Sequence, residues 1–355
     1  MSLFGSLYVG ASGLQTGQNA LNTTAHNLSN VDTKGYTRQQ TLLTDKNYNL
    51  LSVNPKAAAN QQTGLGVTYA DVRQVRDSFL DQKYRKESGR SAFYEVSYNT
   101  LGEVETLLGE LDGESFSESM NDLWEAVQEL AKQPASSVTQ GLLIQRASQF
   151  VEQAGNVYSA LSKYQDNLNN QIKGEVDQIN QYADRLFALN NEIIKIETGG
   201  IERANDLRDE RNQILDALGG YGNISYSEDW NGSVNVKYEG HTLVNATQVF
   251  KIGLDQNSDT GFYTPFWQGD AKKIPQENGT FRYDISNCKV FDLTREISTA
   301  CNTDIGSLKG MLVARGDHRA DYTDLQDADA YNETVSSSIL MNVQAEFDNL
   351  VHNIV

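Results

Sequence analysis

The strongest pattern of apolar and polar positions in this chain runs from about Val138 to Thr198. Two interleaved seven-residue series combine there into one seam, which is typical of a long helix packed along its length: Leu161, Leu168, Glu175, Tyr182, Leu189, Ile196, and Tyr158, Gln165, Ile172, Ile179, Leu186, Ile193. About 60 helical residues span roughly 90 Å, so the segment is either a rod or a helix folded back once. The pair Gly199-Gly200 predicts its end.

A second heptad pattern lies at the N-terminus, with a leucine at every seventh position: Leu7, Leu14, Leu21 and Leu28. Several glycines interrupt the same stretch, and each costs about 1 kcal/mol relative to alanine inside a helix: Gly5, Gly10, Gly13 and Gly17. Alone, such a helix should fray, whereas a partner helix would benefit from the close approach that glycine allows. We therefore predict a helix that becomes ordered on assembly. The pattern alone leaves open an amphipathic helix that covers its own domain.

For the segment between these two patterns, the sequence predicts extended chain followed by a helix. Residues 63–69 are rich in Thr and Gly and indicate short strands, and a helical period returns at about Val72. The helix is expected to end near Asp112-Gly113, and one face of it is predicted from apolar positions: Val75, Phe79, Tyr94, Tyr98, Leu101, Val104, Leu108 and Leu111. Ser115 and Glu118 match a capping box that opens a shorter helix, which Pro134 closes. Another helix is predicted over residues 204–218.

After residue 220 the apolar period changes from helical spacing to alternation. Val234, Val236 and Tyr238 alternate with polar residues next to an Asn231-Gly232 turn, which predicts a β-hairpin. A β-rich character is expected to about residue 315, and apolar spacing from Val335 to Ile354 predicts a last helix. Because that helix has no C-terminal cap, we expect the chain to be a truncation of a longer protein.

These elements predict an α+β fold built from a long, coiled-coil-like helical rod domain. The expected organisation is an N-terminal assembly helix with an extended, conditionally ordered segment (1–71), a helical rod domain (72–218), an inserted β-rich domain (219–332), and a helix that returns to the rod (333–355). Only four prolines interrupt the chain, which suits long helices.

The charge of the chain argues against two classes of partner. Forty-seven acidic residues against 29 basic ones give a formal net charge of −18. Such a charge repels phosphate backbones and anionic lipid, so we predict no nucleic-acid partner and no membrane partner. No apolar run approaches the ~18–20 residues that a bilayer span requires, and the N-terminus lacks the features of a secretory signal.

Candidate chemistry is sparse. The sequence contains no phosphate-binding loop, dinucleotide fingerprint, zinc-protease motif or nucleophile elbow, and its four histidines and two cysteines form no metal-ligand cluster. Residues 255–261 resemble the start of a calcium loop, but the glycine is displaced and Phe266 occupies the twelfth position, so an Asn/Asp turn is favoured. We therefore predict no catalytic residue, no cofactor and no metal. Whether Cys288 and Cys301 pair is left open.

Residues 19–39 carry a motif that resembles a known family. Asn19-Ala20-Leu21 followed by Ala25 to Gln39 closely resembles the A-x-N-[IL]-[SA]-N-x-x-T-x-G-[YF] signature of bacterial flagellar axial proteins, which form rod, hook and hook-associated structures. Lys34 stands where many members have Pro, and Thr37 where Ser is common; neither change disturbs the polar turn. On this resemblance we expect Asn27, Asn30, Thr33, Gly35 and Tyr36 to fix the turn after the helix.

A second stretch narrows the resemblance. Residues 200–218, with Ala204-Asn205-Asp206-Leu207 at their centre, look like the A-N-D-L-x-D-x-R segment of the hook-associated protein 1 family, the hook-filament junction proteins. About 145 residues of preceding helix and the following hairpin also fit that family, and together these features cover most of the chain. We expect Leu7, Leu14, Leu21 and Leu28 to form the assembly interface.

The resemblance implies a non-enzymatic structural subunit that forms a ring between hook and filament. Its implied partners are copies of itself, the hook protein, the adjacent hook-associated protein on the filament side, and an export chaperone that binds a C-terminal region beyond Val355. The implied location is extracellular, in a flagellum, after export through the flagellar type III apparatus.

Three alternatives remain at this stage. The first is a hook or rod subunit, which the long helices disfavour. The second is a peptidoglycan hydrolase that carries the axial signature, although no paired-carboxylate motif supports it. The third is a surface binding module whose aromatic residues contact glycan, but Tyr263, Phe266 and Trp267 are better explained by turn and core packing.

Overall fold

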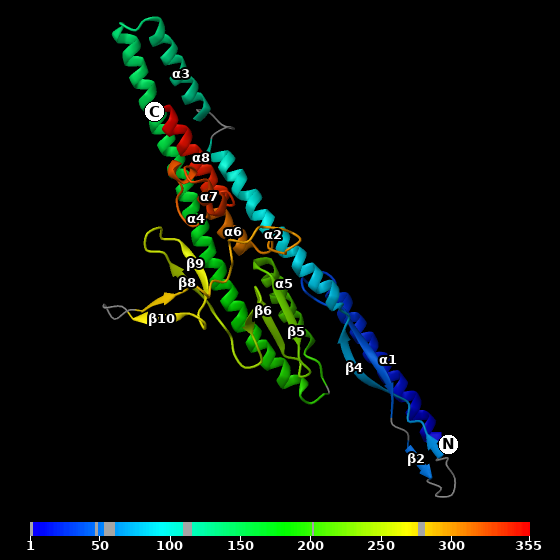
Figure 1. Cartoon of the computed structure of the whole chain (residues 1–355). Helices are drawn as coiled ribbons and strands as arrows, with labels where there is room; N and C mark the ends of the chain where they lie inside the picture. The colour runs from blue at the N-terminus through cyan, green and yellow to red at the C-terminus, as the bar shows by residue number, and fades with distance from the viewer. Residues whose placement is uncertain (1–2, 47–48, 53–60, 109–115, 201, 276–280) are drawn as a thin grey trace.

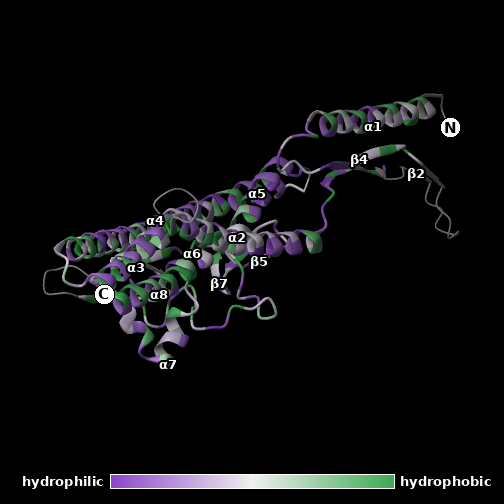
Figure 2. Cartoon of the chain, turned by 90° about the horizontal axis from the view of Figure 1, so that it is seen from above, coloured by the Kyte–Doolittle hydropathy of each residue, from purple (hydrophilic) through white to green (hydrophobic). Residues whose placement is uncertain are grey.

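The chain is described here by a computed structural model that covers residues 3–46, 49–52, 61–108, 116–200, 202–275 and 281–355. It is an elongated molecule in which helices run side by side, with small β-sheets on their flank (Figure 1). An N-terminal helix and a β-ribbon project from one end of this bundle (Figures 1 and 2). The predicted α+β class, with a helical rod, inserted β-structure and a separate N-terminal helix, is confirmed.

Apolar periodicity predicted most of the long helices, and the exceptions are described below. In chain order they are α1 (Leu3–Ser29), α2 (Ser78–Leu107), α3 (Phe116–Lys132), α4 (Ser137–Glu197), α5 (Asn205–Tyr221), α6 (Ser307–Arg315), α7 (Ala328–Ala330) and α8 (Ile339–Ile354). A 3-10 turn, η1 (Tyr322–Leu325), and a π turn, η2 (Tyr331–Val335), flank α7. Ser115 of the predicted capping box and Leu111 of the helix predicted before it lie outside the described residues.

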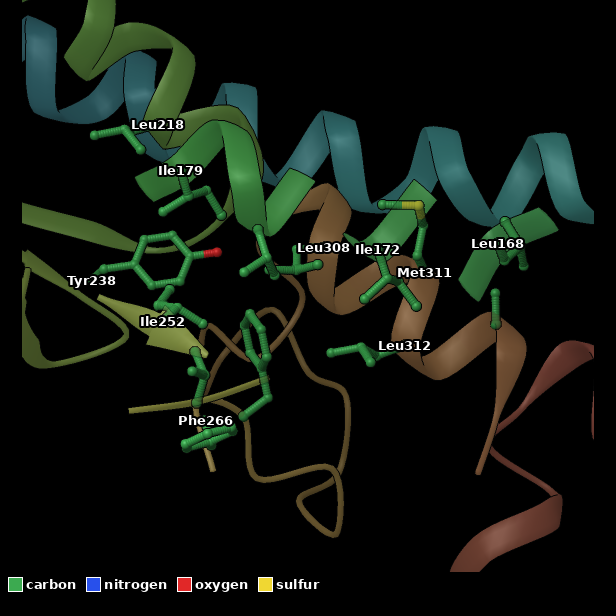
Figure 3. Close-up of a cluster of buried hydrophobic side chains, with 14 of the residues drawn as sticks. Leu168, Ile172, Ile179, Leu218, Tyr238, Ile252, Phe266, Leu308, Met311 and Leu312 are labelled. Atoms are coloured by element: carbon green, nitrogen blue, oxygen red, sulfur yellow. The ribbon is translucent and has the colours of Figure 1, made fainter. Parts of the chain in front are cut away.

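Helix α4 is the axis of the molecule. It is one continuous helix, so of the two alternatives left open by the sequence, a rod or a helix folded back once, the structure shows the rod. Most side chains of the predicted seam are at most 2% exposed, including Leu161, Leu168, Ile172, Ile179, Leu186, Leu189 and Ile193. Helices α2, α3, α5, α6 and α8 all pack against it. Figure 3 shows this core, where Leu168, Ile172 and Ile179 of α4 meet Leu218 of α5 and residues of α6.

The strands form small antiparallel sheets rather than one large one. They are β1 (Gln39–Asp45), β2 (Asn49–Ser52), β3 (Gln61–Thr63), β4 (Val67–Gln74), β5 (Ile224–Glu228), β6 (Val234–Tyr238), β7 (His241–Val244), β8 (Ile252–Gln256), β9 (Tyr263–Trp267), β10 (Lys272–Pro275) and β11 (Phe281–Asp284). The pairings are β1–β4, β2–β3, β5–β6–β7, β8–β9 and β10–β11. The β1–β4 ribbon belongs to the N-terminal end, and the β5–β6–β7 and β8–β9 sheets lie against α4 and α2.

The predicted hairpin at Asn231-Gly232 is confirmed. Strands β5 and β6 pair in register from Ile224↔Tyr238 to Glu228↔Val234, and Gly232 has the left-handed φ of 84° that such a turn requires. Val234, Val236 and Tyr238 are buried as their alternation predicted. The side chain of Asn190 on α4 holds β6 by bonding both the N–H and the C=O of Val234, at 3.0 and 2.9 Å.

The expectation of β-structure continuing to about residue 315 was wrong for its last part. Residues 307–315 form helix α6, and Leu308, Met311 and Leu312 are buried between α2 and α4. The helical spacing of these residues is masked in the sequence by the neighbouring Gly306, Gly310 and Gly316. The domain boundaries at 71, 218 and 332 remain a prediction, although α6, which lies inside the predicted 219–332 domain, packs against α2 and α4 of the rod.

The expected beginning and inner face of the second helix also need correction. Strand β4 continues through Val72 to Gln74, and α2 starts only after Asp77, whose side chain accepts hydrogen bonds from the N–H groups of Phe79 and Leu80. Most of the predicted face points to solvent, including Phe79, Tyr94, Tyr98 and Leu101. The buried positions of α2 are instead Arg85, Gly89, Phe93, Thr100 and Val104.

Gly89 explains why α2 turns this face inward. A Cβ atom at Gly89 would overlap the carbonyl oxygen of Gly219 on α5 and lie 2.7 Å from Cγ2 of Ile305. The carbonyl of Gly89 also accepts a hydrogen bond from the Gly306 N–H at 2.9 Å. Glycine therefore allows α2, α5 and the start of α6 to meet through their backbones.

We expect Gly89→Ala to destabilise the rod by about 1–3 kcal/mol, because the added methyl group must push two backbones apart. Gly102 lies on the same helix, and a Cβ there would meet no atom within 4 Å. Gly102→Ala should therefore be neutral or stabilising by up to about 1 kcal/mol. Urea unfolding followed by circular dichroism measures both changes. Equal midpoints for the two variants would show that the close approach at Gly89 carries no energetic weight.

Candidate assembly surface

Helix α1 presents its leucines to solvent. Leu7, Leu14, Leu21 and Leu28 are 72%, 80%, 68% and 74% exposed, and Val31 continues the row at 71%. Figure 2 shows hydrophobic residues recurring along α1, which lies apart from the bundle beside β4. Complete burial of a leucine side chain is worth about 1.5–3 kcal/mol. The four predicted interface leucines thus share one solvent-exposed face, and burying them against a partner would release a large free energy.

The opposite face of α1 is polar and rests on the β1–β4 ribbon. Ser12 and Thr16 are both 6% exposed. The Ser12 hydroxyl accepts a hydrogen bond from the Val67 N–H at 3.3 Å, and Thr41 of β1 donates to the Thr23 hydroxyl at 3.0 Å. Because small polar residues face inward and leucines outward, the amphipathicity of α1 is the reverse of that of a helix covering its own core. This arrangement disfavours the alternative in which α1 serves its own domain.

Sequence reasoning missed this inner face. Its members recur at helical spacing, as Ser12, Thr16, Thr23 and Asn27. Gly66, which has a φ of 89°, brings the ribbon so close that a Cβ there would overlap the Ser12 hydroxyl. These small polar residues form a stripe opposite the leucines, and this pattern in the sequence could have predicted a close-packed polar contact.

Asn27 fastens the end of α1 to the start of β1. Its amide nitrogen donates to the Gln39 carbonyl at 2.9 Å, and its amide oxygen accepts from the Gln39 N–H at 2.8 Å. The Tyr36 hydroxyl donates to the same amide oxygen at 2.7 Å. Burial is the main factor that raises the pKa of Tyr36, so this phenol stays a hydrogen-bond donor at neutral pH. The side chain of Asn27 thus bonds the backbone of Gln39 in the way that a neighbouring β-strand would.

The remaining motif residues close the helix and shape the turn. Asn30 donates to the His26 carbonyl at 3.0 Å and accepts from the Thr33 hydroxyl at 3.2 Å. Gly35 has a φ of 82°, and a Cβ there would overlap the side chain of Gln213 on α5. The structure therefore brings Asn27, Asn30, Thr33, Gly35 and Tyr36 together in one turn, separate from the leucine face.

We expect Asn27→Ala to release β1 from α1, because both backbone groups of Gln39 lose their side-chain partner. A buried polar group without a partner costs about 1–3 kcal/mol. Amide hydrogen exchange at Gln39 should therefore become faster. Asn22→Ala is the matched control, since Asn22 is an exposed residue of the same helix and the substitution changes helix propensity equally. Unchanged protection of Gln39 in Asn27→Ala would contradict the role given to this amide.

The other candidate features of the sequence have structural explanations. Of residues 255–261, the first two end strand β8 and the rest form a turn in which the Asn257 side chain accepts from the Asp259 N–H at 2.9 Å. Phe266 and Trp267 are buried, as expected for core packing, and Cys288 (buried) and Cys301 (exposed) are free thiols. Within the described ranges, no group of three or more His, Cys, Asp or Glu side chains is placed to hold a metal ion. In the same ranges no helix is both long and apolar enough to cross a bilayer.

Comparison with known proteins decides the family. A profile of the flagellar hook-associated protein FlgK helical domain matches residues 101–281, which is about half of the chain and includes α4 and α5. The chain belongs to the flagellar hook-associated protein FlgK family. A second profile, that of the flagella basal body rod protein, matches residues 7–37, which contain the leucine face and the turn motif. The FlgK match favours this family over hook or rod subunits.

Individual relatives agree with this family. The chain is 27% identical over 352 residues to flagellar hook-associated protein 1 of Bacillus subtilis, covering 98% of this chain and 66% of the relative. It is 29% identical over 249 residues to the protein of the same name from Salmonella typhimurium, covering 70% of this chain and 44% of the relative. The chain therefore spans about two thirds or less of the length of these relatives.

A solved structure supports the fold. The structure of the flagellar hook junction protein FlgK from Burkholderia pseudomallei matches with a TM-score of 0.50 and 17% sequence identity. The match covers 67% of this chain and 38% of that one. It shows that the matched part of this chain shares the fold of that protein.

Proposed function

We propose that this chain is a structural subunit that joins hook to filament in a bacterial flagellum and assembles through the leucine face of α1. The observation that carries the proposal is the row of four leucines, each more than two thirds exposed, on a helix that projects from the rod. Four such side chains buried together would contribute several kcal/mol to association. Family membership supplies the flagellar context.

The proposed partners follow from this role. Copies of the chain form a ring, with the hook protein on one side and the adjacent hook-associated protein on the other. An export chaperone is a further proposed partner, and the type III apparatus exports the chain to the extracellular flagellum. The names of the relatives support assembly with hook-related proteins.

We further propose that α1 becomes firmly ordered only when its leucines are covered. Its contacts to the ribbon are polar, and Gly10, Gly13 and Gly17 lower its intrinsic helicity. The turn and ribbon, by contrast, are tied to the rod. Conditional order is therefore confined to the helix itself.

The location of the chain in the flagellum tests the proposed function. Immunogold electron microscopy with an antibody against the β5–β7 sheet should place label at the boundary between hook and filament. Label spread along the whole hook would contradict the junction role and support a hook subunit. Label confined to the rod, on the cell side of the hook, would contradict it as well.

We propose that the chain has no enzymatic activity, since its relatives are named as hook-associated proteins and none as a hydrolase. In zymography, the purified chain should leave a peptidoglycan gel uncleared at protein loads where lysozyme produces a clear band. Clearing that persists after repurification would contradict this prediction and support a wall hydrolase that carries the axial signature.

A further inference from the structure

The two stretches that carry the family resemblance meet in space. The turn and the β1–β4 ribbon that follow α1 lie against the N-terminal half of α5 (Figure 1). We call this contact the joint and define it by Asn205, Asp209 and Gln213 of α5 together with Thr37 and Gln74 of the N-terminal part. These residues are more than 130 positions apart in the sequence.

Hydrogen bonds from side chain to backbone dominate the joint. Asn205 donates to the Val72 carbonyl at 2.9 Å, and Gln74 donates back to the Asn205 carbonyl at 2.9 Å. Asp209 accepts from the Gln74 amide at 2.8 Å and from the Thr37 N–H at 3.2 Å. Gln213 donates to the Lys34 carbonyl at 3.0 Å. The joint therefore holds the end of β4 and the turn between α1 and β1.

Helix α5 is suited to connect two bodies because its faces have different partners. Asn205, Asp209 and Gln213 recur every fourth residue and form the face toward the ribbon. Ile214, Leu215 and Leu218 are buried in the rod core. Arg208 binds Glu197 through two 2.7 Å contacts, and Arg211 donates to the Gly232 carbonyl at 2.6 Å. The rod thus fixes α5, and α5 in turn holds the ribbon.

Apolar packing does not hold the N-terminal part to the rod. Among the described residues, no apolar side chain before Phe93 is fully buried. A contact between two bodies that is mainly polar permits relative motion unless specific bonds prevent it. The orientation of the ribbon therefore depends on the joint.

Asp209 is the central residue of the joint. It is 6% exposed and accepts from Thr37, just before β1, and from Gln74, at the end of β4. Arg203 and Asp71 add an ion pair of 2.8 Å at the edge, where both side chains are partly exposed and the contribution is small. Loss of the Asp209 carboxylate would remove this acceptor from the part-buried Thr37 N–H and would leave the Gln74 amide with the Asn205 carbonyl alone.

We propose that Asp209, assisted by Asn205, is a positioning residue that sets the direction in which the N-terminal ribbon, and with it the leucine face of α1, projects from the rod. This inference rests on the proposed function, because it assigns the joint the task of aiming the assembly face. It does not require assembly for its test, since the joint exists within one chain.

Distances between spin labels on the full chain test the proposal. In a Cys288→Ser, Cys301→Ser background, labels at Thr44→Cys on β1 and Asp177→Cys on α4 report the ribbon's position relative to the rod, and both sites are exposed. Double electron–electron resonance should give one narrow distance peak. Asp209→Ala should abolish that single peak and give a broad distribution, while circular dichroism shows an intact rod.

Two further variants make the result specific. Asp206→Ala removes an exposed carboxylate from the same turn of α5 and should keep the narrow peak. Gln74→Ala cuts the joint from the ribbon side without changing any rod residue, so it should broaden the peak even if Asp209→Ala impairs folding. A narrow peak at the original distance in both Asp209→Ala and Gln74→Ala would overturn the proposal. The result is independent of the leucine face, whose failure would appear only in assembly.

Discussion

Replacing Leu14 or Leu21 with Asp will abolish assembly while leaving the rod folded. Both side chains are more than two thirds exposed in the isolated chain, so the substitutions cost little there. In the assembly each change removes about 1.5–3 kcal/mol of apolar burial and forces a carboxylate into an apolar contact. Cells that carry either variant should lose swarming motility and attached filaments. Purified variants should keep the circular dichroism and unfolding midpoint of the rod.

Gln15→Asp is the matched control for these variants. Gln15 is an exposed residue next to Leu14, and it points away from the row of leucines. This variant adds the same charge to the same turn and should assemble normally. Normal assembly of Leu14→Asp and Leu21→Asp would refute the leucine face as the interface. Loss of rod helicity in these variants would instead show that α1 and the rod fold together.

Hydrogen exchange should show a large difference between α1 and α4 in the isolated chain. Amides from Leu7 to Leu21 should exchange rapidly, because α1 contains several glycines and has no buried apolar residue among its described side chains. Amides around Ile172 and Ile179, whose side chains are completely buried, should exchange only through global opening. After assembly, the α1 amides should become protected by orders of magnitude.

The control for this measurement lies within the same chain. The Gln39 N–H, bonded to Asn27, and the Thr37 N–H, bonded to Asp209, should be protected before assembly. Strong protection of Leu7 to Leu21 in the monomer would contradict the conditional order of α1. It would leave the joint and the leucine face untouched, because neither depends on α1 being loose.

The long helix and the first hairpin of the inserted sheets could be predicted because their buried positions are occupied mainly by apolar residues. The seam of α4 is apolar at nearly every buried position, and the Asn231-Gly232 pair marks its turn without reference to other segments. The leucine face of α1 was predicted for the same reason. The leucines are exposed because the small polar face of α1, and not the leucine face, packs against the ribbon.

Other features were not predictable because their residues do not look buried. The inner face of α2 contains Arg85 and Gly89, which a hydrophobic pattern does not count as apolar. Its exposed face contains Tyr94 and Tyr98, which the pattern does count. Helix α6 is short, and the glycines that flank it are typical of a loop. The joint depends on partners more than 130 residues apart, so Asp209 looks like an ordinary charged residue near a helix start until the chain is folded.

The junction role itself is tested most directly by electron microscopy of flagella from cells that lack this protein. The proposal predicts hooks of normal length without filaments, because the subunit that connects the two structures is missing. Re-expression of the unaltered protein should restore attached filaments. Filaments attached to hooks in the deletion strain would contradict the junction role.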